Sequence, residues 1–332
     1  MFSQRGMPPS APRAAALLCA AALASAAPYS GPRMQLGTGG GGGGFDAPAW
    51  ISAGGTAFNM ALAYCYAQFS PQCSQVTVAN AVADAKLAGA FLATKIEPED
   101  FSAQLSRIWG SGSSPTVSRD VLQEMNVAKV DVLMWHQAGR AQGASNFIPE
   151  CFNASAAGPD GPGAYSACRV LGHKQLLAVQ KAGGATTVGV SNYPVRDLQQ
   201  LFDATGVWPE VLEIELHPYW HEDALIDFAV ARNITILAYA PLAKGAMGPG
   251  LLQDPAVAKV AAAHGVTPAQ AVLRWGLQRT GGVVLPRSTN PAHMRDNLAV
   301  LGMAWSLSDA EMAALAALPQ RKLYNTACFP WC

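Results

Sequence analysis

Three polar side chains stand where short apolar segments end, and together they could protonate a carbonyl oxygen. They are Tyr64, Lys95 and His136. An ammonium group beside a phenol makes the phenol a better proton donor, and an imidazole can orient or polarise a carbonyl. A lysine that ends an apolar strand is unusual, because a buried ammonium is unfavourable unless it is paired or functional. The set therefore indicates carbonyl reduction, with Tyr64 as the general acid.

The apolar segments alternate with longer helix-like stretches, which is typical of an α/β fold and of the (β/α)8 TIM barrel in particular. We predict strands at 34–37, 57–60, 90–94, 130–135, 187–190, 211–216, 234–239 and 282–285. Two later helices carry capping-box sequences, Thr267 with Gln270 and Ser308 with Glu311. The active site of such a barrel lies at the C-terminal ends of its strands, so the three polar residues should meet there.

The residues after the last predicted strand suit a phosphate group. Arg287, Ser288 and Thr289 offer a cation and two hydroxyls, and Pro291 marks a helix start with free backbone amides. This combination fits the 2′-phosphate of NADP. The glycine run at 39–44 is a weaker candidate for a phosphate loop, because only its glycines match the dinucleotide-binding pattern, and we predict a flexible connection there.

Four motifs in order along the chain resemble those of the aldo-keto reductases. They are TVGVSN at 187–192, EIELHPY at 213–219, AYAPL at 238–242 and LPRST at 285–289. The resemblance extends from about residue 34 to about residue 318. It implies a (β/α)8 barrel that reduces aldehydes or ketones to alcohols with NADPH as cofactor, forming NADP+, and NAD(H) stays open as an alternative.

The resemblance also implies roles for the candidate catalytic residues. Tyr64 is similar to the family's general acid, Lys95 to its activating lysine, and His136 to the histidine beside the substrate carbonyl. Asn59 stands at the position of the aspartate whose carboxylate pairs with that lysine. We therefore expect Lys95 to lack this negative partner, the reductase to be slowed, and Asn59→Asp to raise turnover.

Further residues resemble those that hold the cofactor in the family. Ser191 and Asn192 are similar to the pair that binds the nicotinamide carboxamide, and Tyr239 to the ring that stacks on the nicotinamide. Glu213 replaces the family's usual glutamine, and a carboxylate can accept a hydrogen bond from the carboxamide but cannot donate one. The remaining expected cofactor residues are Pro241, Leu242, Arg287, Ser288, Thr289, His293, which stands where many relatives keep arginine, and Asn297, which resembles the adenine-contacting asparagine.

The two departures at Asn59 and Glu213 keep a second class of function open. A barrel that binds NADP(H) with little or no turnover could act as a redox sensor or as a partner-binding subunit. Such a sensor would bind NADPH tightly but would not consume it in the presence of several aldehydes, whereas a reductase would.

The N-terminus resembles a targeting segment. Arg5 and Arg13 precede an apolar stretch at 14–23 and a small-residue cleavage site at 24–26. We predict a leader at 1–26 and a single barrel domain at 27–332, with the secretory pathway or an organelle lumen as the destination and the cytoplasm as the alternative. Six cysteines would remain, in three sequence-local pairs that could form disulfides: Cys65, Cys73, Cys151, Cys168, Cys328 and Cys332.

The composition excludes several other classes of partner. Lys plus Arg equals Asp plus Glu, 22 each, and no basic run marks a nucleic-acid surface. After the leader, no apolar stretch is long enough to span a membrane. Glu215 and His217 lack a third ligand at a suitable spacing, so we expect no metal. The predicted partner is a small-molecule carbonyl compound, the predicted state is a monomer, and a loop at 138–166 should overhang the site.

Overall fold

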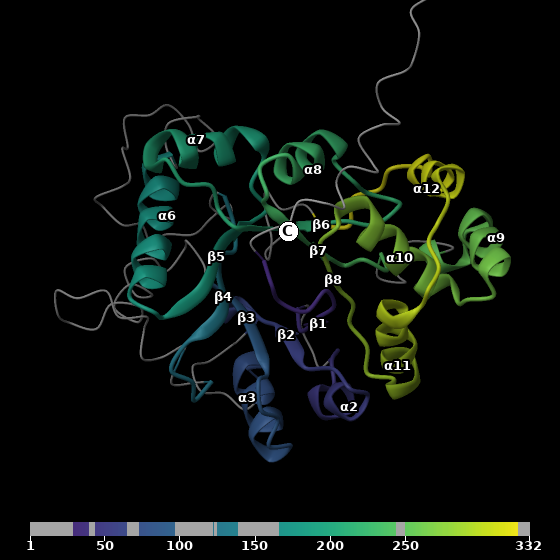
Figure 1. The fold of residues 1–332 in the computed structure, drawn as a ribbon, viewed down its shortest axis with the longest axis horizontal. Helices are drawn as coiled ribbons and strands as arrows, with labels where there is room; N and C mark the ends of the chain where they lie inside the picture. Colours follow the sequence, from purple (N-terminus) through teal and green to yellow (C-terminus); the bar gives the residue numbers. More distant parts are fainter. Residues whose placement is uncertain are drawn as a thin grey trace, which may run out of the picture.

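The computed structural model describes residues 29–39, 44–64, 73–96, 122, 125–138, 166–243 and 250–324 of the chain. In this part eight parallel strands form one sheet in the order β1 to β8, with helices outside it (Figure 1). The strands are β1 (Leu36–Gly37), β2 (Ala57–Asn59), β3 (Phe91–Ile96), β4 (Val130–Trp135), β5 (Ala185–Ser191), β6 (Val211–Glu215), β7 (Thr235–Tyr239) and β8 (Val283–Leu285). All eight predicted strands are confirmed, although several begin or end a residue or two from the predicted place.

The sheet closes on itself between its first and last strands. Met34, just before β1, pairs in parallel with Val284 of β8, and the backbone N of Gln35 donates to the Val284 carbonyl at 3.1 Å. The backbone N of Gly37 donates to the Pro286 carbonyl at 3.0 Å. Because every strand runs in the same direction, closure brings all the C-terminal strand ends to one rim of the barrel.

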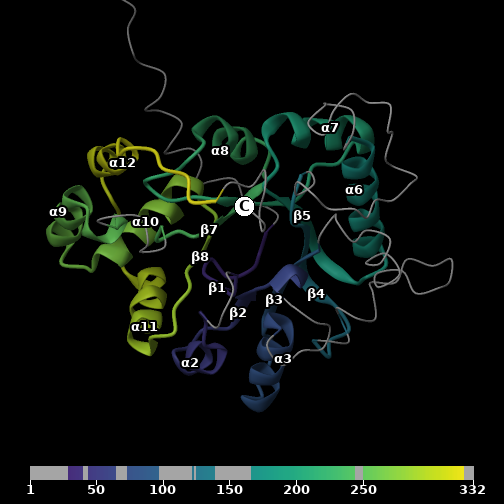
Figure 2. The ribbon, with the colours of Figure 1, turned by 180° about the vertical axis from the view of Figure 1, so that it is seen from behind.

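Helices surround the barrel in both views (Figure 1, Figure 2). They are α2 (Ala47–Ser52), α3 (Ser74–Asp84), α6 (Ser166–Lys181), α7 (Val195–Thr205), α8 (Asp223–Val230), α9 (Pro255–His264), α10 (Pro268–Thr280), α11 (Pro291–Ala299) and α12 (Asp309–Ala316), with 3-10 turns η1 (Leu62–Tyr64), η2 (Leu251–Gln253) and η3 (Val300–Gly302). Both predicted capping boxes are present, at the starts of α10 and α12. These caps satisfy backbone amides that the first helical turn leaves free.

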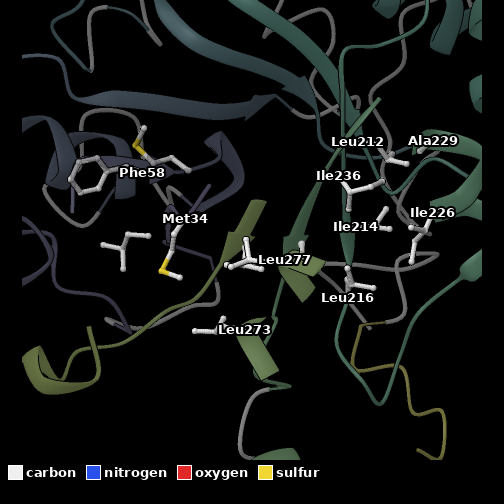
Figure 3. Packing of buried hydrophobic residues seen from close by; sticks show 14 of the residues in the cluster. Met34, Phe58, Leu212, Ile214, Leu216, Ile226, Ala229, Ile236, Leu273 and Leu277 are labelled. Atoms are coloured by element: carbon white, nitrogen blue, oxygen red, sulfur yellow. The ribbon is translucent and has the colours of Figure 1, made fainter. Parts of the chain in front are cut away.

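One layer of the core lies between the strands and the helices. Leu212 and Ile214 of β6 and Ile236 of β7 face Ile226 and Ala229 of α8 (Figure 3). Successive side chains of a strand point to opposite faces. The neighbours of Leu212 and Ile214 along β6, including Glu213, must therefore point into the barrel.

A second, smaller layer fills the barrel interior. It contains Ala93 of β3 and Val211 of β6, together with residues from β4, β7 and β8. The same alternation places Lys95 on the Ala93 face of β3, and it places Asn59 on the face of β2 opposite the outward-packed Phe58. Three polar residues from three strands thus share the apolar interior of the barrel.

Several expectations concern residues that lie outside the described part of the chain. These are the leader at 1–26, residues 40–43 of the glycine run, and residues 139–165 of the predicted loop. Of the six cysteines, Cys73 is disulfide-bonded, while Cys65, Cys151, Cys328, Cys332 and the side chain of Cys168 lie outside the described part of the chain. Among the described residues, no helix has the length and apolar character needed to cross a membrane.

Candidate active site

A cavity of about 400 Å³ opens at the C-terminal rim of the barrel. Residues that end β1, β2, β7 and β8 contribute to its wall, as expected for the active site of such a barrel. The lining residues are Gly37, Thr38, Gly39, Asn59, Tyr64, His136, Asn192, Glu213, Tyr239, Ala240, Pro241, Leu242, Leu252, Leu285, Pro286, Arg287, His293 and Tyr324.

Lys95 is completely buried and contacts Asn59 and Glu213 of the cavity wall. Its strand continues to Ile96, so the residue lies within β3 and not just after it as predicted. Lys95 Nζ forms an ion pair with Glu213 Oε1 at 2.9 Å and donates a hydrogen bond to Asn59 Oδ1 at 2.5 Å. A buried ammonium is tolerated when a carboxylate and further acceptors surround it in this way.

Asn59 completes a triangle with these two residues. Its Nδ2 donates to Glu213 Oε2 at 2.7 Å, while its Oδ1 accepts from Lys95. The amide orientation is fixed, because the reverse would place an NH2 group against an ammonium and an oxygen against a carboxylate. The expectation that Lys95 lacks a carboxylate partner is therefore wrong: Glu213 supplies the carboxylate from β6.

Tyr64 and His136 come together above this triangle. Their rings meet edge to face, with centroids 5.7 Å apart, and Lys95 Nζ lies 5.7 Å from the centroid of the Tyr64 ring. Tyr64 ends η1, and His136 directly follows β4. The structure thus brings together all three residues that the sequence indicated for carbonyl chemistry.

Gly39 is the backbone neighbour that allows this position of Tyr64. A Cβ atom built at residue 39 would lie 2.6 Å from the Tyr64 hydroxyl oxygen, closer than real Cβ atoms approach. The carbonyl oxygen of Gly39 also accepts a hydrogen bond from Arg287 Nη1 at 2.5 Å. The start of the glycine run therefore packs against two predicted site residues from opposite parts of the chain.

Asn192 is the centre of a second polar network, on the β5 side of the cavity. Its backbone has a positive φ of 62°, a conformation that asparagine tolerates better than most residues. Nδ2 donates to the His136 carbonyl and to Ser191 Oγ, each at 3.0 Å, and Oδ1 accepts from the Tyr239 hydroxyl at 3.0 Å. The network therefore connects the ends of β4, β5 and β7.

Tyr239 is held as a neutral phenol within this network. Burial, followed by the nearby carboxylates of Glu215 and Glu213, raises the pKa of the Tyr239 phenol well above its usual value. A raised pKa means that the hydroxyl keeps its proton and serves as a hydrogen-bond donor. Tyr239 therefore presents a neutral aromatic ring to the cavity.

The other predicted cofactor residues divide into two groups. Arg287 and His293 line the cavity, as do Pro241 and Leu242. The others do not line it: Ser288 Oγ accepts from the backbone N of Asn290 at 3.0 Å, Thr289 is exposed, and Asn297 is buried on α11. The cofactor contacts expected for these three residues stay predictions.

Sequence reasoning missed Tyr324 and the role of Glu215. Tyr324 lines the cavity and packs edge to face on Tyr239, with centroids 5.6 Å apart. Glu215 accepts from the backbone N of Leu323 at 2.6 Å and of Tyr324 at 3.0 Å, and its Oε1 lies 3.0 Å from His217 Nε2. Tyr324 follows the last recognisable motif, so nothing in its sequence surroundings marks it. The buried charge of Glu215, in an inward-facing register, was the available signal.

Among the described residues, no group of three or more His, Cys, Asp or Glu side chains is arranged to hold a metal ion. The Glu215 carboxylate contacts the His217 imidazole. It also accepts hydrogen bonds from two backbone amides.

Comparisons with known proteins agree with this architecture. The chain is 30% identical over 236 residues to "Aldo-keto reductase family 4 member C11" of Arabidopsis thaliana, which covers 68% of this chain and 69% of that protein. It is 36% identical over 149 residues to "Methylglyoxal reductase DkgA" of Salmonella typhimurium, covering 45% of this chain and 52% of the relative. The chain thus spans about half the length of this second relative.

Solved structures share the fold. An aldo/keto reductase from Brucella melitensis superposes with a TM-score of 0.64 at 20% identity, covering 86% of this chain and 94% of the other. The aldose reductase from Schistosoma japonicum gives a TM-score of 0.65 at 20% identity, with 88% and 90% covered. The Aldo/keto reductase family model matches residues 47–319. The chain therefore belongs to the aldo/keto reductase family, whose members are NAD(P)H-dependent oxidoreductases that act on carbonyl groups.

Proposed function

We propose that this chain reduces aldehydes or ketones to alcohols with NADPH, and that Tyr64 is the general acid. The observation that carries the proposal is the meeting of Tyr64, His136 and the buried, carboxylate-paired Lys95 at one cavity. A cavity of about 400 Å³ is within the ordinary size range for small-molecule sites.

The wall of the cavity fits a nicotinamide dinucleotide. Arg287 and His293 line the β8 side, where a guanidinium can bind phosphate oxygens, and the neutral ring of Tyr239 offers a stacking surface at the end of β7. Ser191 and Asn192 would hold the carboxamide. When bound, NADPH would supply the hydride to the carbonyl carbon. A solved neighbour with 24% identity, a variant of Gox0644, is in complex with NADPH.

The residues of this chain would manage the proton and the developing charge. Tyr64 donates its hydroxyl proton to the carbonyl oxygen, and the nearby Lys95 ammonium stabilises the resulting phenolate. His136, whose ring lies against Tyr64, orients the carbonyl toward the phenol. Burial of this set in a largely apolar barrel strengthens each of these electrostatic interactions.

Arg287 supports NADPH as the preferred cofactor. It provides a charged fork at the cavity wall, suited to a phosphate that NAD(H) lacks. An equal kcat/KM with NADH and with NADPH would show that neither Arg287 nor His293 gives the enzyme a preference for the 2′-phosphate.

The first carbonyl compounds to test are those for which relatives are named. These are methylglyoxal and D-xylose, from the Salmonella relative and from "Probable NAD(P)H-dependent D-xylose reductase xyl1" of Emericella nidulans. The assay follows NADPH consumption by the full chain and by Tyr64→Phe. We expect Tyr64→Phe to lower kcat by about 10²- to 10⁴-fold while still binding NADPH.

Tyr219→Phe is the matched control for the loss of a phenolic oxygen. The Tyr219 hydroxyl donates to Asp254 at 2.8 Å, and the residue is not part of the cavity wall. Equal turnover by wild type and Tyr64→Phe would refute the proposed acid. NADPH binding without turnover of any carbonyl compound would instead favour the alternative of a sensor or partner-binding barrel.

A further inference from the structure

We infer that Asn59 and Glu213 form one exchanged pair, in which Glu213 on β6 has taken over from β2 the task of neutralising and positioning Lys95. Glu213 is thus a positioning residue that acts on Tyr64 through Lys95. The inference rests on the proposed function for its effect on catalysis, but the pairing itself can be tested without turnover.

Lys95, Asn59 and Glu213 contact one another pairwise. Glu213 uses one oxygen for Lys95 and the other for Asn59, and Asn59 uses both ends of its amide. All three side chains are at most 3% exposed. Each of the three groups thus contacts both of the others, so a change at one position alters the hydrogen-bonding of the other two.

The charges at positions 59 and 213 depend on each other. Asn59→Asp alone would place a carboxylate oxygen where Nδ2 now lies, 2.7 Å from Glu213 Oε2. Two carboxylates at that distance cannot both stay ionised without strong repulsion. Glu213→Gln alone would remove the carboxylate that contacts Lys95 and leave two amides around a buried ammonium.

The double substitution restores one carboxylate and one amide. In Asn59→Asp with Glu213→Gln, the aspartate would accept from Lys95 and from the glutamine amide, and the glutamine oxygen could accept from Lys95. The net charge and the numbers of donors and acceptors equal those of the wild type. The two single changes should therefore be harmful, and their combination should be far less so.

Lys95 connects the pair with Tyr64. Lys95 Nζ lies 5.7 Å from the centroid of the Tyr64 ring and is held from two sides by Asn59 and Glu213. A lysine that is neutral or displaced would no longer stabilise a phenolate on Tyr64. The pair should therefore affect kcat and its dependence on pH more than the KM for the carbonyl compound.

The experiment is a double-mutant cycle on the full chain with wild type, Asn59→Asp, Glu213→Gln and the double variant. For each protein we would measure kcat and KM with methylglyoxal, the pH profile of kcat, NADPH affinity and the thermal midpoint. We expect each single variant to lose about tenfold or more in kcat and the double variant to recover to within about threefold of wild type. The pH profile of kcat should be shifted in each single variant and should match that of the wild type in the double variant.

Glu210→Gln is the matched control for loss of a partly buried carboxylate near β6. Glu210 Oε2 accepts from Gln180 and from the backbone N of Val188, away from the cavity wall. This variant should keep the kcat of the wild type, even if its thermal midpoint falls.

The inference and the proposed function can fail separately. Losses in kcat that add in the double variant, with wild-type turnover that depends on Tyr64, would overturn the pairing and leave the reductase intact. Absence of turnover in the wild type, with a double variant more stable than both singles, would support the pairing and remove the reductase. If none of the four proteins turns over, the thermal midpoints alone test the pairing. A double variant whose thermal midpoint is no higher than that of the less stable single variant would overturn it.

Discussion

The carboxylate of Glu215 holds the backbone amide of Tyr324 at 3.0 Å, although 109 residues separate the two along the chain. The neighbouring amide of Leu323 donates to the same side chain at 2.6 Å. Glu215 is buried inside the barrel rim, and Tyr324 lies in the cavity wall against Tyr239. The segment that ends the described part of the chain is therefore fastened to β6 at the edge of the candidate site.

Glu215→Gln should loosen this segment, because an amide oxygen replaces two anionic acceptors. We expect a loss of about 1–3 kcal/mol in the free energy of unfolding and a higher KM for the carbonyl compound. Urea denaturation and steady-state kinetics measure the two effects. Glu210→Gln, which also loses a carboxylate bonded to a backbone amide, should show the first effect without the second. An unchanged KM in Glu215→Gln would show that the position of Tyr324 does not matter to the substrate.

Gly39→Ala should impair Tyr64 through a steric effect. The added Cβ would lie 2.6 Å from the Tyr64 hydroxyl, so the phenol or the backbone must move. A displacement of about 1 Å from a productive position can lower a catalytic rate about 10²-fold. We expect kcat to fall by at least tenfold with little change in NADPH affinity. Gly302→Ala is the control, since a Cβ there meets no atom within 4 Å. Equal kinetics for the two variants would contradict the placement of Gly39 against Tyr64.

Arg287→Met should separate the two nicotinamide cofactors. Removal of a charged partner of a phosphate weakens binding by about 1.5–3 kcal/mol, which corresponds to roughly tenfold or more in the Kd for NADPH. The Kd for NADH should change by less than about twofold, because NADH lacks the 2′-phosphate. Arg295→Met, an exposed change on the following helix α11, controls for the general loss of positive charge. Parallel weakening of both cofactors by Arg287→Met would place the arginine elsewhere on the dinucleotide.

His173 on α6 should make the barrel sensitive to mild acid. Burial lowers the pKa of this imidazole, with an opposing contribution from its hydrogen bond to the Val207 carbonyl at 3.0 Å. The unfolded chain then binds more protons than the folded protein, so the stability contribution is complete above the ordinary histidine pKa of 6.5 and is lost as the pH falls below it. The expected slope is about 1.4 kcal/mol per pH unit until the folded protein also takes up the proton.

Urea denaturation between about pH 7.5 and 5 would measure this slope. The same series with His173→Gln gives the comparison, because glutamine can donate to the Val207 carbonyl but does not titrate. An identical pH dependence in both proteins would assign the acid sensitivity to other groups.

Much of the barrel could be predicted from the sequence, because strand length, alternation and capping are local properties. Lys95 was found for the same reason, as a charge in an apolar strand, even though β3 continues past it to Ile96. The partner of Lys95 was not found. Asn59 and Glu213 are 154 residues apart, and nothing local tells which interior side chains of two distant strands meet.

The interpretation of Asn59 and Glu213 as separate positions failed because their side chains form one network around Lys95. Taken alone, Asn59 is a lost carboxylate and Glu213 is an added one. In the folded barrel the two lie 2.7 Å apart and share Lys95, so the total charge around the lysine is kept. Tyr324 was missed for a related reason, since its place at the cavity depends on the long-range contact with Glu215.

The kcat of Asn59→Asp relative to wild type tests the central claim most directly. The sequence alone predicts a rise, because a missing carboxylate would be restored next to Lys95. The geometry predicts a fall of about tenfold or more, because the new carboxylate would face Glu213 at hydrogen-bond distance. A higher kcat in Asn59→Asp, in a protein that still folds and binds NADPH, would contradict the assignment of Glu213 as the counter-ion of Lys95.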